Sequence, residues 1–200
     1  MPHILNDREQ LCQYYLNHIF KNMRGHGTDM AGKKIIAQSY GEILYPSIAK
    51  LLSIIPLHAD DVFVDAGSGL GKLALQIFLT SPVKAVYGIE IVARLHQQAI
   101  LAEQKLREDL LECYQNEREL KFILGNFLDL PLTNTTVLFL GSPCFSPSML
   151  DTLSIKIENI LSIHTVLTLR PLNLLQRLKF KKILRLEASW DTTLCYVYSN

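Results

Sequence analysis

The chain has 200 residues, of which 20 are basic and 19 acidic, and its formal net charge is +1 at pH 7. A hydrophobic share of 48% at this length allows one domain with a substantial core and excludes a disordered chain, while the balanced charge indicates no overall preference for nucleic acid. No apolar run approaches the roughly 18 residues of a membrane span, and the N-terminal residues lack the apolar core of a signal peptide.

The first sixty residues are expected to be helical, with a loop between two helices. Residues 7–21 predict an amphipathic helix, which Asn6 or Asp7 could cap. The side chains expected on its apolar side are Leu11, Tyr14, Tyr15, His18 and Ile19. The glycine-containing residues 22–34 predict a flexible loop, and Pro46 fits the first turn of a second helix that Pro56 ends. We assign residues 1–40 to an N-terminal segment and residues 41–200 to the main domain.

Beyond residue 60, short apolar runs alternate with helical patterns. Strands are expected at 61–65, 85–90, 120–124, 136–140, 163–169, 180–189 and 193–199, and helices at 71–80, 91–115, 147–160 and 171–178. In the long helix, Glu103 and Arg107 are spaced to pair on the exposed side. The alternation predicts an α/β fold with a mainly parallel sheet, in which the last two strands, with no helix between them, form an antiparallel hairpin at the edge.

The most specific signal lies between the first two of these strands. An apolar run leads into Asp65, then into Gly67, Gly69 and Gly71 at alternate positions, and then into a helical pattern. This arrangement is typical of the cofactor-binding corner of an open parallel sheet, where the backbone passes close to a ligand. The spacing differs from the dinucleotide pattern G-x-G-x-x-G and resembles that of methyltransferases that bind S-adenosylmethionine. Glu90 ends the next strand, where such folds bind ribose hydroxyls.

Several motifs together resemble one family, the non-SET histone lysine methyltransferases named for disruption of telomeric silencing. They are Tyr40-Gly41-Glu42, the stretch 61–72, Tyr87-Gly88-Ile89-Glu90, Gly125-Asn126-Phe127-Leu128, the stretch 134–147, and Ser189-Trp190 with Tyr196 and Tyr198. Their order and spacing over residues 40–198 make the resemblance fairly specific. It implies a class I methyltransferase (Rossmann-like) fold with seven strands. It also implies in-line transfer of a methyl group from S-adenosylmethionine to a protein lysine amine, with no metal.

The resemblance also implies roles for single residues. The expected cofactor-binding residues are Glu42, Asp65, Gly67, Ser68, Gly69, Gly71, Lys72, Glu90, Asn126 and Phe127. Among them the glycine turn and Asp65 would line the methionine part, Glu90 would accept hydrogen bonds from the ribose diol, and Asn126 and Phe127 would border the adenine. The expected catalytic residues are Tyr40, Phe145, Trp190 and Tyr196, of which the last three would wall a narrow channel for the target amine.

Three positions depart from the family pattern. Gly141 stands where the family has an asparagine near the acceptor lysine, Asn126 replaces an aspartate, and Lys72 replaces a glutamine. The change at Gly141 keeps a second hypothesis open, in which the acceptor is a small molecule or nucleic acid. A third is a non-catalytic module that binds S-adenosylmethionine, against which the combined presence of Asp65, the glycines and Glu90 argues.

The expected partner is a protein with an accessible lysine, such as a small basic or histone-like protein. Residues 170–185 contain six basic and no acidic side chains, which predicts either a contact with an acidic surface or nucleic acid, or an ordinary solvated surface. Cys12, Cys113, Cys144 and Cys195 lie too far apart in sequence for a zinc site or a short-range disulfide framework. We therefore expect reduced thiols, no bound metal, no membrane contact and a cytoplasmic setting, with export to a host compartment left open.

Overall fold

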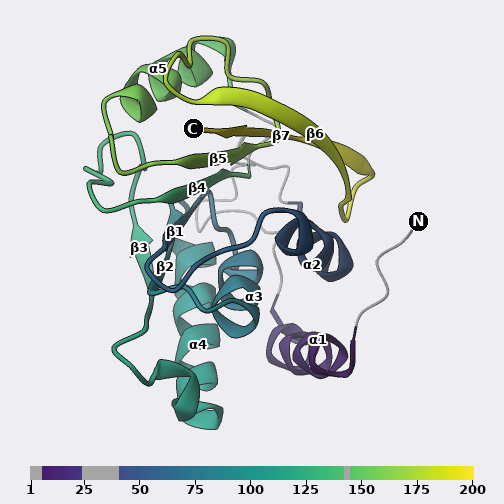
Figure 1. Ribbon diagram of the computed structural model, residues 1–200. Coiled ribbons are helices and arrows are strands. Elements are labelled where there is room, and N and C mark those ends of the chain that lie inside the picture. Colours follow the sequence, from purple (N-terminus) through teal and green to yellow (C-terminus); the bar gives the residue numbers. More distant parts are fainter. Residues whose placement is uncertain (1–5, 24–40, 142–144) are drawn as a thin grey trace.

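The computed structural model describes residues 6–23, 41–141 and 145–200, which form one seven-stranded sheet covered by helices (Figure 1). The strands are β1 (Val62–Ala66), β2 (Ala85–Glu90), β3 (Glu119–Leu124), β4 (Val137–Leu140), β5 (Thr165–Thr168), β6 (Lys179–Glu187) and β7 (Thr192–Ser199). The helices are α1 (Asp7–Phe20), α2 (Tyr45–Ile54), α3 (Lys72–Thr80), α4 (Ala93–Asp109), the 3-10 turn η1 (Leu111–Tyr114) and α5 (Pro147–Glu158).

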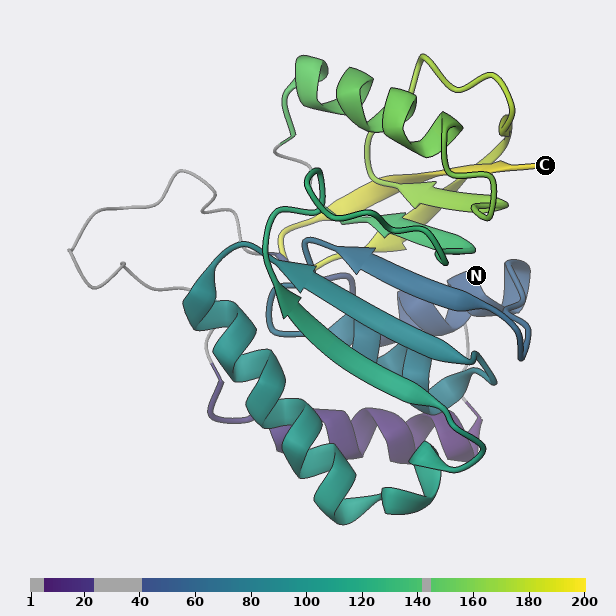
Figure 2. The same cartoon turned by 90° about the vertical axis from the view of Figure 1, so that its left-hand side faces the viewer.

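The sheet has the strand order β3-β2-β1-β4-β5-β7-β6 and confirms the predicted architecture. Strands β1 to β5 are parallel, and β7 runs antiparallel between β5 and β6. The chain leaves β1 in one direction to β2 and later returns on its other side to β4, so β1 and β4 mark a topological switch point. Ligands of open α/β sheets bind at the carboxyl ends of such strands, which all lie along one edge here (Figure 2).

Two apolar cores lie on opposite faces of the sheet. Helices α1 to α4 cover one face, where Phe63 and Val86 pack with Phe78 and Leu106. Helix α5 covers the other face with its own buried cluster, which includes Val64, Leu138, Leu153 and Ile157 (Figures 1 and 2). The alternation of Phe63 and Val64 between the two cores follows from the period of two along a strand. Among the described residues, no helix is both long and apolar enough to cross a membrane.

Helix α1 is capped as predicted but presents a different side to the core. Its cap is reciprocal, because Glu9 N donates to Asn6 Oδ1 at 3.0 Å and Asn6 N donates to Glu9 Oε2 at 2.8 Å. The buried side is Leu16, Ile19 and Phe20, whereas Leu11 and Tyr14 are 68% and 75% exposed. Of the five residues predicted to form the apolar side, only Tyr15 and Ile19 contribute to the core. The contact with α3 and α4 decides the orientation, since apolar residues occur around most of this helix.

The predicted helix at 171–178 is wrong, and the segment crosses the surface as irregular chain. Its backbone groups bond to side chains instead of to one another. The carboxylate of Glu158 accepts from the N–H groups of Gln176 and Arg177, and Leu172 N donates to the hydroxyl of Tyr198 at 3.0 Å. The guanidinium of Arg177 in turn donates to carbonyls at the end of α5 and beyond it.

The long predicted helix at 91–115 is interrupted near its end. Helix α4 stops at Asp109, Leu110 turns to φ −136° and ψ 54°, and η1 follows as a separate 3-10 turn. The predicted pair on its exposed side is confirmed, with Arg107 Nη2 and Glu103 Oε1 2.8 Å apart.

A polar network joins the amino ends of β1, β4 and β5, at the edge opposite the glycine turn. Asp61 Oδ1 accepts from Thr136 Oγ1 at 2.7 Å and faces His164 Nε2 at 2.9 Å, while Asp61 Oδ2 accepts from His58 N at 2.7 Å. Burial raises the pKa of Asp61, but these hydrogen bonds together outweigh burial, and the net pKa lies below its usual value. Asp61 is only 2% exposed, so its hydrogen bonds are shielded from solvent and must offset the cost of burying its charge.

We expect the substitution Asp61→Asn to lower the free energy of unfolding by about 1.5–3 kcal/mol at neutral pH, because it removes charge-assisted hydrogen bonds. The lowered folded pKa means that Asp61 stabilises fully above its unfolded value, near 3.8, and loses this contribution as the pH falls below it. Urea unfolding at about pH 7 and about pH 3 measures both effects. The exposed neighbour Asp60→Asn is the control, and a difference that persisted undiminished at the lower pH would contradict the assignment.

Candidate cofactor and acceptor site

The glycine turn after β1 has the conformation that its sequence predicts. Gly67, Gly69 and Gly71 have φ of +89°, +56° and +84°, a region that residues with a Cβ seldom adopt. Gly67 N and Ser68 N donate to the carbonyl of Ile89 at 2.8 and 3.0 Å, so the turn is fastened to the end of β2. Helix α3 then starts at Lys72 without a side-chain cap.

The ring of Phe122 explains why two positions around this turn are glycine. A Cβ on Gly88 would lie 2.4 Å from Phe122 Cδ1, and a Cβ on Gly71 would lie 2.5 Å from Phe122 Cζ. Phe122, in β3, therefore packs directly against backbone at both places and holds the start of α3 close to β2. Sequence reasoning missed this residue, because an apolar residue in a strand carries no signal of such a contact.

Glu90 is held at the end of β2 with both carboxylate oxygens oriented. Glu90 Oε2 accepts from Gly69 N and Oε1 accepts from Val92 N, both at 2.8 Å. The side chain is 7% exposed. Each oxygen keeps a second lone pair, so the carboxylate can still accept hydrogen bonds from a pair of neighbouring hydroxyls.

Asp65 is a buried carboxylate with no hydrogen-bond donor among the described residues. It is 3% exposed at the end of β1. Burial, and then the neighbouring charge of Glu90, raise the pKa of Asp65 to about 7. A buried carboxyl group of this kind is best satisfied by a cation, such as the ammonium of an amino acid moiety.

The loop that carries Glu42 is attached to the far hairpin. Glu42 N donates to Ser189 Oγ at 3.1 Å, Ser189 N donates to Glu42 O at 2.8 Å, and Ile43 pairs with Ala188. From this position Glu42 Oε2 forms an ion pair with Lys72 Nζ at 2.6 Å. The lysine that replaces the family glutamine thus links the first turn of α3 to the hairpin through Glu42. Ser189 was not predicted to have this role.

Trp190 packs on the backbone of this same loop. A Cβ on Gly41 would lie only 2.0 Å from Trp190 Cε3, so the indole covers Gly41, and the side chain remains 43% exposed. Trp190 therefore occupies the turn of the β6–β7 hairpin and does not fill the core.

The adenine side of the expected pocket is formed by the loop after β3. Asn126 Oδ1 accepts from Leu128 N at 3.1 Å, so the oxygen that we expected to face adenine already shapes the turn and has one lone pair left. Lys156, from α5, donates to the carbonyls of Phe127, Leu128 and Leu130 and fixes the loop from below. Desolvation lowers the pKa of Lys156. Its position at the end of a helix gave no signal of this role.

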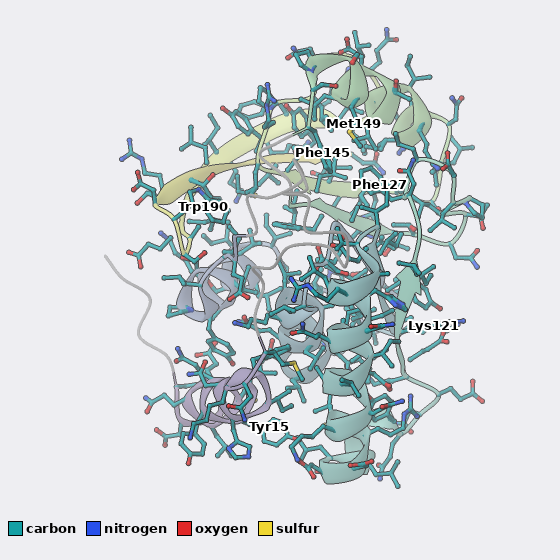
Figure 3. The ribbon with its side chains drawn as sticks, turned by 180° about the vertical axis from the view of Figure 1, so that it is seen from behind. Tyr15, Lys121, Phe127, Phe145, Met149 and Trp190 are labelled. Carbon is teal, nitrogen blue, oxygen red and sulfur yellow. The ribbon has the colours of Figure 1, made fainter. Side chains whose placement is uncertain are left out.

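The expected acceptor residues do not form one wall. Phe145 packs against Phe127, with ring centroids 5.2 Å apart, and its carbonyl accepts from Arg170 (Figure 3). Tyr196 is half-buried on the same face of the sheet, whereas Trp190 lies at the hairpin turn, apart from Phe145 (Figure 3). No ring contact joins Trp190 to the other two within the described residues. Tyr40 lies outside the described residues.

Gly141 is explained by the residue two positions before it. A Cβ on Gly141 would lie 2.9 Å from Phe139 Cε1, and Phe139 is 2% exposed, so its ring cannot easily move. The same Cβ position is 4.0 Å from Asp65 Oδ1. With the Phe139 ring in this position no asparagine fits at residue 141.

Comparison with known proteins identifies the family to which this site belongs. The family model described as "Histone methylation protein DOT1" matches residues 32–184. The chain belongs to this family. Members of the family use S-adenosylmethionine. The residues present fit that cofactor, since the glycine turn leaves room for it and Asp65 and Glu90 offer acceptors for its ammonium and its ribose hydroxyls.

Individual relatives agree with this assignment. The H3 lysine-79 specific histone-lysine N-methyltransferase of Drosophila melanogaster is 28% identical over 114 residues, which are 55% of this chain and 6% of that protein. The chain thus matches a small part of that relative. Two solved structures show the same fold. One is a putative RNA methyltransferase from Pyrococcus horikoshii, with a TM-score of 0.63 and 15% identity, covering 98% of this chain and 99% of that one. The other is an RNA methyltransferase from Salinibacter ruber in complex with S-adenosyl-L-homocysteine, with a TM-score of 0.54 and 21% identity, covering 77% of this chain and 90% of that one.

We expect the substitution Gly88→Ala to destabilise the protein by about 1–3 kcal/mol, because its Cβ would overlap Phe122. It should also weaken S-adenosylhomocysteine binding, since Phe122 supports the glycine turn. Gly125→Ala is the matched control for stability, because the nearest atom to its Cβ is Leu130 Cδ1 at 3.9 Å. Urea unfolding and calorimetric titration measure the two effects. Equal behaviour of the two variants would show that the Phe122 contact is unimportant.

We expect the affinity for S-adenosylhomocysteine to rise with pH up to about 7, because the ligand ammonium favours ionised Asp65 and below this pH Asp65 must first release a proton. The change is at most about tenfold per pH unit. Calorimetry in buffers of different ionisation heat detects the released proton. 5′-Methylthioadenosine, which lacks the amino acid, should show little of this dependence. An equal dependence for both ligands would argue against the role of Asp65.

Proposed function

We propose that the chain transfers the methyl group of S-adenosylmethionine to the side-chain amine of a protein lysine. The match of the DOT1 family model over residues 32–184 carries this proposal, because it includes the cofactor corner, the loop with Glu42 and most of β6. The similarity to the H3 lysine-79 specific enzyme supports it. The substrate is expected to be a protein with an accessible lysine, such as a small basic or histone-like protein.

In this proposal the chain binds and orients the two reactants and performs no covalent chemistry itself. The sulfonium cofactor supplies an activated methyl group. Asp65 would bind its ammonium, Glu90 its ribose hydroxyls, and the loop held by Lys156 would border the adenine. In-line displacement then requires a neutral amine about 3 Å from the methyl carbon, with water excluded.

Trp190, at the hairpin turn, would contact the incoming lysine side chain. Trp190 is partly exposed beside the loop that carries Glu42, and an aromatic face attracts a cationic side chain on approach. A desolvated surrounding then lowers the pKa of the amine and favours loss of its proton. Phe145 and Tyr196, on the α5 side, would complete the enclosure only if the chain closed further around the substrate.

A second candidate keeps the cofactor and changes the acceptor to a nucleic-acid or small-molecule amine. The glycine at position 141 favours it, because the family asparagine near the acceptor is absent and a Cβ there would overlap Phe139. Solved structures described as RNA methyltransferases share the fold. A third candidate is a module that binds S-adenosylmethionine without catalysis, but Asp65 and Glu90 are both retained and positioned, which argues against it.

Methyl-labelled S-adenosylmethionine with a panel of acceptors tests the proposal. Histones, nucleosomes, small basic proteins, lysate protein and RNA are compared. Label is expected in a protein band, on lysine, and resistant to nuclease. Glu90→Ala should reduce cofactor affinity about 10- to 150-fold, equivalent to about 1.5–3 kcal/mol, and abolish labelling at low cofactor concentration. The exposed Glu108→Ala is the control. Label confined to RNA would reject the lysine acceptor, and cofactor binding without label would support the third candidate.

A further inference from the structure

The exposed edge strand β6 carries a concentrated positive charge. Its cationic side chains, here called the basic strip, are Lys179, Lys181, Lys182 and Arg185, all of them exposed. The two other basic residues of the 170–185 stretch serve the fold. Arg170 donates to the carbonyl of Phe145, and Arg177 donates to carbonyls near the end of α5. Of the six basic residues, two therefore bond to the backbone of the fold and four are exposed on β6.

Among the described residues, no acidic side chain forms a salt bridge with the basic strip, although Glu187 lies at the end of the same strand. The paired strand β7 contains no charged residue, and the positions opposite Lys179, Lys182 and Arg185 are Ser199, Val197 and Leu194. Four like charges within about 20 Å of one strand repel each other, so an anionic partner would relieve a local cost.

Large apolar side chains are exposed on the same edge of the sheet. In the register with β7, Phe180 and Ile183 lie on the face of Tyr198 and Tyr196, whereas Lys179 and Lys182 lie on the other face, so the edge presents apolar side chains on one side and these lysines on the other. The ring of Phe180 contacts that of Tyr198, with centroids 5.9 Å apart. Phe180 is 53% exposed and Ile183 is 46% exposed, both on β6, and Leu194 of β7 is 39% exposed. Lysines alone on an edge strand are an ordinary protection against aggregation. An exposed phenylalanine and isoleucine have the opposite effect, so protection of the edge does not account for the whole pattern.

We propose that the basic strip and Phe180 bind single-stranded nucleic acid. Cations along an edge strand can follow a phosphate backbone, and exposed rings provide stacking surfaces for unpaired bases. An acidic protein would use the cations but gains no stacking from Phe180. The strand ends at the hairpin turn with the partly exposed Trp190, so a bound strand would be led towards the cofactor side of the sheet (Figure 1).

This proposal goes beyond the proposed function and does not depend on it. The strip lies on β6, whereas the cofactor residues lie on β1, β2 and the loops that follow them. Glu90→Ala should therefore bind nucleic acid as the wild type does, even when its cofactor affinity is lost. Failure of the acceptor assay and failure of nucleic-acid binding are for this reason separate results.

Fluorescence anisotropy with a labelled oligothymidine of about 12 nucleotides tests the proposal in the full-length chain. Four phosphate contacts predict that log K falls with log salt with a slope of about −2.8. Affinity should then fall about 20-fold between about 50 and 150 mM salt. Lys179→Gln with Lys182→Gln should halve this slope. Lys84→Gln with Lys121→Gln, at exposed lysines on the opposite side of the sheet, should leave it unchanged.

Phe180→Leu separates stacking from charge. It keeps an apolar side chain of similar size, so it should lower affinity about five- to a hundredfold while leaving the salt slope unchanged. Thermal unfolding and S-adenosylhomocysteine binding confirm that each variant is folded. Absence of binding at about 50 mM salt, or equal binding by both double-lysine variants, would overturn the proposal. Equal competition by a polyglutamate peptide of matched charge would instead identify the strip as a surface for acidic proteins.

Discussion

The contact between the ring of Phe122 and the backbone at Gly71 and Gly88 is the constraint on which the site depends. It lets α3 start immediately above β2 and places the glycine turn next to the end of that strand. In this arrangement Gly67 N and Ser68 N donate to the carbonyl of Ile89. The close approach also brings Gly69 N to the carboxylate of Glu90. One aromatic side chain thus determines where the ligand-facing groups lie.

The cofactor side and the hairpin side of the molecule are physically connected. The segment with Gly41 and Glu42 is bonded to Ser189 and covered by Trp190, and the same Glu42 forms an ion pair with Lys72 at the start of α3. A substitution at Trp190 or Ser189 is expected to shift Glu42 and Lys72, because short contacts join these groups. A glutamine at position 72, as in the family pattern, would keep a hydrogen bond here but would remove the charge attraction.

The net charge of +1 conceals an uneven distribution, in which negative and positive side chains gather at different places on the sheet. Two carboxylates, Asp65 and Glu90, are buried together at the carboxyl ends of neighbouring strands. Four exposed cations, none in a salt bridge with a described residue, lie on the edge strand β6. The buried pair favours a cationic ligand, whereas the exposed strip favours an extended anion. The two sites on the same sheet therefore suit ligands of opposite charge.

The sequence by itself determined the α/β class, the seven strands, the terminal hairpin, the glycine turn and the carboxylate that ends β2, because local periodicity and backbone freedom specify these features. The tertiary structure alone decided that Lys72 pairs with Glu42, that Phe139 excludes a side chain at residue 141, and that Trp190 covers Gly41. It also decided that residues 171–178 form irregular chain and that the guanidinium groups of Arg170 and Arg177 donate to backbone carbonyls of the same chain. Most of these outcomes depend on contacts between segments far apart in the chain, and no local pattern of residues encodes them.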